Sequence, residues 1–158
     1  MPVKPKIRIT DNSRLREELE RVYEKANSIH AATWALATAK RVLAAAGIDY
    51  HAIDELVDGF RVNELWQTGE ACVHDLRQAG FSIHRLARKC GGEIERAALR
   101  AAGHAVGSGH MREHAMVASD YAVKTAGLLT SNAIEAVTWE RELQVSELRR
   151  IIRQRRRP

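Results

Sequence analysis

Apolar side chains recur at alternating spacings of four and three residues along most of this chain, which places them on one face of an α-helix. The first run follows a polar cluster at residues 11–13, whose short side chains can cap a helix. Its apolar face is made by Leu15, Leu19, Val22, Ala26, Ile29, Leu36 and Leu43, with Thr33 in the same register. The run predicts either one long helix that ends at Gly47 or two helices that join near Ser28.

Glycines and short polar residues divide the rest of the chain into further helices. We expect Asp49 to cap the next helix and residues 130–132, Thr-Ser-Asn, to cap the last one. The helices are predicted near residues 50–66, 72–90, 93–106, 110–129 and 133–152. Six or seven helices with connections of a few residues predict an all-α fold, an antiparallel bundle in a single domain.

The composition agrees with an all-α fold. Aromatic residues make up only 5% of the chain, and the three prolines lie near its ends, where they break no helix. Only residues 3–10 alternate as a strand does, and Pro5 interrupts them. We therefore expect an N-terminal arm at 1–10, a helical domain at 11–152 and a basic tail at 153–158.

No stretch has the roughly 20 apolar residues of a membrane span, and the N-terminus lacks the apolar core of a signal peptide. We therefore expect a cytoplasmic protein without a membrane partner.

The net charge of +5 is located at one end of the chain. Residues 141–158 contain seven arginines and two glutamates, so the preceding 140 residues are neutral overall. Proteins that bind nucleic acid usually spread basic side chains over a folded face, among aromatics or beside a reading helix. A neutral body with a basic tail is therefore weak evidence for nucleic-acid binding. Cations also suit the C-terminal end of a helix, so we expect a solvated tail and no nucleic-acid partner.

The two cysteines, Cys72 and Cys90, are predicted to share one helix. Eighteen residues at about 1.5 Å each would separate them by roughly 27 Å, which no disulfide can span. No CxxC or similar spacing is present. We therefore expect two buried free thiols rather than a redox pair.

Polar side chains gather in one segment, residues 101–124, which reads AAGHAVGSGHMREHAMVASDYAVK. In its second half the residues at helical spacing are His110, His114, Val117, Tyr121 and Lys124. Two imidazoles, a phenol and an amine are therefore predicted along one helix face.

Three interpretations of this face compete. Two histidines at i and i+4 can hold a metal ion, but His84 or His104 would have to converge on it as a further ligand. Imidazoles can also act in acid–base catalysis, although no activated nucleophile is visible in the sequence. The third interpretation, which we favour, is a hydrogen-bonded network between packed helices, with no metal and no cofactor. The nearby glycines follow no strand, which argues against a phosphate-binding loop.

Several motifs in this chain occur in a characteristic order. They are Trp66 with Gly69 and Glu70, Phe81 followed by His84, AAGHAV at 101–106, HMREHA at 110–115, YAVKTA at 121–126, and Glu140, Arg141 and Gln144. This arrangement, over roughly residues 34–150, resembles a bacterial family of small helical domains, the immunity proteins of polymorphic toxin systems. The chain departs from the family pattern at residues 107–109, Gly-Ser-Gly, where such domains tend to carry Ala or Thr. The first 30 residues and the Arg-rich tail look like additions.

The resemblance implies a non-enzymatic protein that binds and neutralises a cognate toxin. It also implies one polar face, structural or binding, formed by His84, Gly103, His104, His110, His114, Tyr121 and Lys124. Two alternatives stay open: a metal- or small-molecule-binding protein or enzyme that uses the histidine face, and a nucleic-acid-associated protein that acts through its tail. We also expect a homodimer, because the apolar face of the first helix, including Leu15, Leu19, Val22 and Ile29, would be costly to expose.

Overall fold

The computed structural model describes residues 4–109 and 111–154, and within these ranges it contains seven α-helices, one 3-10 helix and no strand. The helices are α1 (Ser13–Tyr23), α2 (Ser28–Ala45), η1 (Tyr50–Ala52), α3 (Asp54–Gln67), α4 (Val73–Lys89), α5 (Glu93–Gly107), α6 (His114–Leu129) and α7 (Ile134–Gln154). The predicted all-α fold is confirmed. In the described part of the chain, no helix has the length and apolar character needed to cross a membrane.

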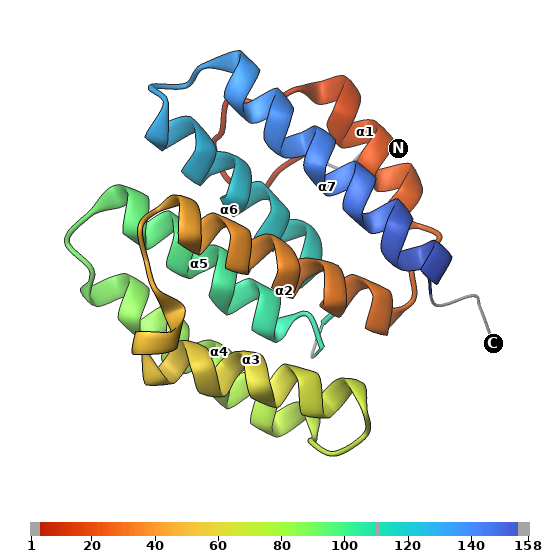
Figure 1. The fold of residues 1–158 in the computed structure, drawn as a ribbon, viewed down its shortest axis with the longest axis vertical. Helices are drawn as coiled ribbons and strands as arrows, with labels where there is room; N and C mark the ends of the chain where they lie inside the picture. Colours follow the sequence, from red (N-terminus) through yellow and green to blue (C-terminus); the bar gives the residue numbers. More distant parts are fainter. Residues whose placement is uncertain (1–3, 110, 155–158) are drawn as a thin grey trace.

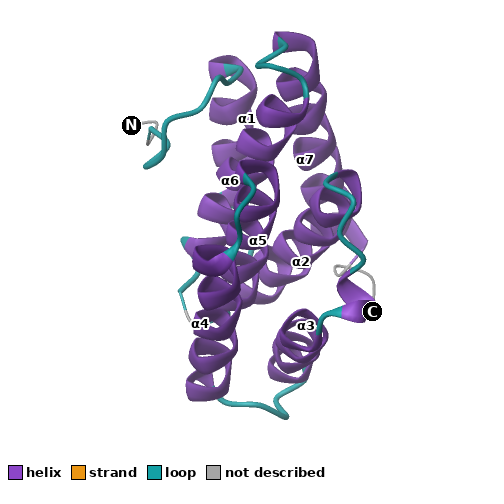
Figure 2. Cartoon of the chain, turned by 90° about the vertical axis from the view of Figure 1, so that its left-hand side faces the viewer, coloured by secondary structure: helices purple, strands orange, loops and turns teal. Residues whose placement is uncertain are grey.

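The helices pack in three groups. In Figure 1, α2, α5 and α6 lie side by side in the middle, with the pair α3 and α4 on one side and the pair α1 and α7 on the other. Figure 2, turned by 90°, shows the same order. The first and last helices of the chain are therefore neighbours.

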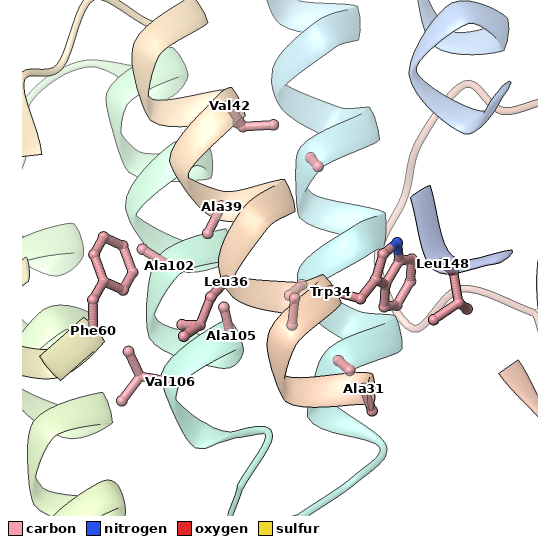
Figure 3. Close-up of a cluster of buried hydrophobic side chains, with 14 of the residues drawn as sticks. Ala31, Trp34, Leu36, Ala39, Val42, Phe60, Ala102, Ala105, Val106 and Leu148 are labelled. Carbon is pink, nitrogen blue, oxygen red and sulfur yellow. The ribbon is translucent and has the colours of Figure 1, made fainter. Parts of the chain in front are cut away.

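The core is centred on α2, which contacts helices of both outer groups. Figure 3 shows Trp34 and Leu36 of α2 among side chains that include Phe60, Val106 and Leu148. Trp34 is fully buried, and its indole Nε1 donates a hydrogen bond of 3.0 Å to the backbone carbonyl of Gln144. The hydrogen bond satisfies the polar end of a large apolar side chain and links α2 to α7.

The first apolar run forms two helices rather than one. The side chain of Asn12 accepts a hydrogen bond of 3.1 Å from the backbone N–H of Leu15 and so caps α1. Asn27 does the same for α2, accepting a bond of 2.8 Å from His30, while the His30 ring accepts one from the Asn27 backbone. This reciprocal pair satisfies two N–H groups at the start of α2 and separates it from α1.

Two predicted caps serve other elements. Asp49 accepts a hydrogen bond of 3.1 Å from the backbone of His51 and caps the short helix η1, whereas α3 begins after Ile53 without a side-chain cap. The segment 130–132 closes α6, because the backbone N–H of Asn132 donates to the carbonyl of Gly127 at 2.8 Å. Asn132 has a φ of 63°, a left-handed conformation that asparagine adopts more readily than most residues. The prediction that this segment caps the last helix was therefore wrong.

The cysteines lie at the two ends of α4, as N-cap and C-cap. Both are free thiols, but Cys72 is exposed and Cys90 is only half-buried, so the prediction of buried thiols was wrong. A position at a helix end places the side chain outside the packed stripe of the helix. There the Cys72 thiol donates to Asp75 Oδ2 at 3.1 Å, and this bond lowers the pKa of the Asp75 carboxyl.

The apolar face of α1 is covered within the same chain. Leu15, Leu19 and Val22 are all buried, and α1 packs against α7. Because α7 already covers most of this apolar face, burying it does not require a second copy of the protein. The homodimer stays a prediction that α1 does not support.

A buried ionic network links Asp11, two residues before α1, to residues of α1, α6 and α7. Arg141 Nη2 lies 2.8 Å from Asp11 Oδ2 and 2.7 Å from Asp120 Oδ1, and its side chain is fully buried. Arg16 binds the other oxygen of Asp120 at 2.9 Å. Burial acts to lower the pKa of Arg141, but the two aspartates outweigh it and raise the pKa, so Arg141 is charged in the folded protein.

Candidate functional site

The structure brings together most of the residues that the sequence singled out. His84 lies on α4, Gly103 and His104 lie on α5, and Tyr121 and Lys124 lie on α6. His114 is the first residue of α6, which begins four residues later than predicted. His110 lies outside the described residues. We call His84, His104, His114 and Tyr121 the histidine cluster.

His104 is the centre of the histidine cluster. Its ring centroid lies 4.7 Å from that of His84 in an edge-on arrangement, and 5.1 Å and 5.4 Å from those of His114 and Tyr121, on which it stacks. His104 Nδ1 lies 2.9 Å from His114 Nδ1. Because one of these nitrogens must donate and the other accept, the pair shares a single proton at this contact.

Arg100 fixes the proton position on His84. The guanidinium Nη1 lies 3.1 Å from His84 Nδ1, and since a guanidinium can only donate, this nitrogen accepts and the proton is on Nε2. Burial, followed by the charge of Arg100, lowers the pKa of His84 to about 4. Burial and the neighbouring His84 lower that of His104 to about 3. Both rings are therefore neutral at neutral pH.

The glycine of the Gly-His motif makes room for His84. A Cβ atom on residue 103 would lie 2.6 Å from His84 Cε1, closer than two carbon atoms can approach. Gly80 faces the carbonyl of Gly103 with only 3.4 Å available for a Cβ. Helices α4 and α5 therefore pack closely at this point, and the imidazole occupies the notch.

The departure from the family pattern at residues 107–109 also has a packing reason. A Cβ on Gly109 would lie 2.5 Å from Leu76 Cδ1 and 3.0 Å from Trp66 Cε3. Ser108 is buried, and its hydroxyl donates to the carbonyl of Ala105. Trp66, one of the family-like residues, thus packs over a position where this chain needs glycine.

Two of the competing interpretations of the histidine cluster concern metal binding and acid–base catalysis. Within the described ranges, no group of three or more His, Cys, Asp or Glu side chains is arranged to hold a metal ion. A general base works best when its pKa is near the working pH, and the pKa values of His84 and His104 lie well below neutrality. The ring contacts of His104 with His84, His114 and Tyr121 join α4, α5 and α6.

Two hollows lie beside the histidine cluster, and Tyr121 lines both. The larger, of about 300 Å³, includes Lys6 and Ile7 of the N-terminal arm with His104 and His114. The smaller, of about 120 Å³, lies between α5 and α6 and includes Arg100 and Lys124. Tyr121 therefore lies between a hollow that includes apolar side chains of the arm and α6 and a hollow lined by cationic side chains.

A sequence model described as "Imm-5 like putative immunity protein" matches residues 21–151 of the chain. The chain belongs to this family. The match extends from within α1 nearly to the end of α7, so it includes the histidine cluster, Asp120 and Arg141, whereas Asp11 and Arg16 of the buried network precede it. No curated protein and no solved structure gives a significant match.

Arginines beside the family-like residues escaped the sequence analysis. Arg96 and Arg100 precede His104 at spacings of four, so the three residues share one face of α5. Their spacing of four residues along a predicted helix could have revealed them in the sequence. In the immunity-protein family member described here, this row of three residues joins the histidine cluster to a positively charged surface.

Proposed function

We propose that this protein is a non-enzymatic immunity protein that neutralises a cognate toxin by binding it. The observation that carries the proposal is the family match over residues 21–151. Binding a toxin requires a stable scaffold with a surface complementary to it, and it requires no chemistry of its own.

The state of the histidine cluster supports a binding role rather than a catalytic one. His84 and His104 are neutral and hydrogen-bonded to Arg100 and His114, respectively. Rings that bind one another across three helices fix the positions of those helices. A fixed scaffold loses little conformational entropy when it binds a partner.

Exposed apolar side chains offer contact surface for a partner. Phe81 on α4 is 50% exposed, and Trp139 on α7 is 63% exposed. Large aromatic side chains are enriched among the residues that contribute most to protein–protein binding. The two residues lie on helices of the two outer groups, α4 and α7 (Figure 1).

Co-expression tests the proposal. The toxin candidate is the product of a toxin-like reading frame next to the gene, expressed in a bacterial host with and without this protein. We expect growth arrest by the candidate alone, rescue by co-expression, and a stable complex of the two purified proteins. Rescue without any complex, or a complex that forms only with added zinc or nickel, would contradict the proposal.

A further inference from the structure

The smaller hollow beside the histidine cluster concentrates positive charge. It lies between α5 and α6, has a volume of about 120 Å³, and is lined by Glu93, Arg96, Ala97, Arg100, Tyr121 and Lys124. Three of these side chains are cationic, and one is a carboxylate. We call Arg96, Arg100, Tyr121 and Lys124 the arginine–lysine pocket.

The cations of this pocket lack acidic partners. Among the described residues, none of Arg96, Arg100 and Lys124 has a carboxylate oxygen within ion-pair distance. The acidic residue of the lining, Glu93, is exposed in the first turn of α5, where the helix dipole favours a negative charge. Three like charges around one hollow repel one another, and a bound anion would relieve that repulsion.

The pocket also has free hydrogen-bond donors. Arg96 donates to the carbonyl of Cys90 at 2.7 Å and Arg100 donates to His84, but a guanidinium has five N–H groups. In the described part of the chain, the Lys124 amine and the Tyr121 hydroxyl have no hydrogen-bond partner, although both residues are half-buried. Donors from two helices therefore converge on the hollow, whose lining contains one carboxylate, the exposed Glu93.

The histidines next to the pocket indicate a positive local potential. Arg100, Arg88 and Lys6 each act to lower the pKa of a neighbouring histidine, and no carboxylate acts on either His84 or His104. Because these rings are neutral, they add no positive charge of their own. The neutral rings of His84 and His104 therefore add no electrostatic repulsion to the cations of the pocket.

We propose that the arginine–lysine pocket receives a carboxylate side chain of the toxin, an inference that rests on the proposed function. A volume of about 120 Å³ fits a carboxylate and a few water molecules, since each water takes about 30 Å³, and it is smaller than the 300–1,000 Å³ of typical cofactor sites. Arginine can bind a carboxylate through two parallel hydrogen bonds, and Lys124 and Tyr121 supply further donors. The partner is therefore an acidic surface with one aspartate or glutamate that enters the pocket.

Acetate tests the pocket without any toxin. The protein is titrated with sodium acetate, against sodium chloride at equal ionic strength, while NMR follows the Arg and Lys side-chain signals. We expect saturable chemical-shift changes at Arg100 and Lys124 with acetate only. In Lys124→Gln we expect the change at Arg100 to be lost. Lys25→Gln, which removes one exposed amine on the α1–α2 connection, should leave the acetate response of Arg100 unchanged. Shifts that do not saturate, or that chloride reproduces, would overturn the pocket.

Toxin binding distinguishes a toxin carboxylate from a free small anion. We expect Lys124→Gln to weaken the affinity for the toxin about tenfold or more, and Lys25→Gln to change it less than twofold. Lys124→Gln should also be at least as stable as the wild type, because it removes repulsion. Acetate binding with unchanged toxin affinity would overturn the toxin assignment and leave a site for a free anion. Failure of the wild type to bind the toxin would overturn the proposed function and the toxin assignment together. The acetate titration tests independently whether the pocket binds a carboxylate.

Discussion

The imidazole of His84 fills the space beside Gly103, and a Cβ atom on residue 103 would lie 2.6 Å from its Cε1 atom. The missing side chain at Gly103 thus leaves space on α5, and the imidazole of His84 on α4 fills that space. The same ring accepts a hydrogen bond from Arg100, one turn before Gly103 on α5. A glycine, a histidine and an arginine therefore fix the contact between α4 and α5.

This contact predicts that Gly103→Ala destabilises the protein. We expect a loss of about 1–3 kcal/mol, the usual cost of an extra methyl group in a packed site, in spite of alanine's higher helix propensity. Denaturant unfolding at neutral pH measures it. Gly91→Ala is the control, because a Cβ there meets nothing within 4 Å. Adding His84→Ala to Gly103→Ala should recover part of the loss, and equal effects of the two glycine substitutions would contradict the packing argument.

The neutral histidines predict a loss of stability in mild acid. Burial lowers the pKa of His84 to about 4 and that of His104 to about 3, whereas an unfolded histidine has a pKa near 6.5. Between these values the unfolded chain binds more protons than the folded one, so stability is complete above about pH 6.5 and falls as the pH decreases toward 4. The decrease is at most about 1.4 kcal/mol per pH unit for each histidine, and solvent screening reduces it.

The variant His104→Gln separates this effect from other titrating groups. We expect it to be less stable than the wild type at pH 7.5 but to lose less stability between pH 6.5 and 4.5. Glu140, whose pKa is raised by burial, is present in both proteins and cancels in the comparison. Parallel stability curves for the two proteins would show that His104 does not contribute to the pH dependence.

The buried network predicts a large cost for removing Arg141. Arg141→Met leaves Asp11 without its buried cation and Asp120 with only Arg16, so we expect a loss of about 3–5 kcal/mol of unfolding free energy. Arg150→Met is the matched control, since Arg150 is 52% exposed and its ion pair lies at the surface. Denaturant unfolding measures both variants. A loss below 1 kcal/mol for Arg141→Met would mean that the network contributes little.

The position of Cys72 predicts one readily accessible thiol. A thiol reagent such as dithionitrobenzoate should react with the native protein in two phases, the faster from exposed Cys72 and the slower from half-buried Cys90. Cys72→Ser should remove the fast phase only. A single slow phase in the native wild type would contradict the exposure of Cys72.

The fold class could be predicted from the sequence because apolar residues recur at regular spacings of three and four residues in its helices. The α4 stripe and the glycines after it gave the helix ends within about one residue. The break between α1 and α2 stayed ambiguous, because the apolar register continues through it and the cap of Asn27 is only visible once His30 faces it. Local patterns of apolar residues define helices, and caps that depend on side-chain geometry define where they stop.

The site was predicted in part. The sequence and the family resemblance pointed to His84, His104, His114 and Tyr121, and the structure places them together. The neutrality of His84 and His104 could not be predicted, because it depends on burial and on Arg100, which only the packing of α4 against α5 reveals. The same holds for the buried partners of Arg141, which are separated from it by up to 130 residues.

The pairing of α1 with α7 has a consequence for how the chain is made. Helices α2 to α6 contact one another and are contiguous in sequence, so they can fold while synthesis continues. Leu15 and Leu19 of α1 stay uncovered until α7 is made, and α7 lies on the order of 100 residues later in the chain. Synthesis of the intervening residues takes on the order of ten seconds at about 5–20 residues per second. Throughout that interval the nascent chain exposes an apolar helix face that a chaperone can bind. Of the helices that the structure describes, α7 leaves the ribosome last, and it covers the apolar face of α1.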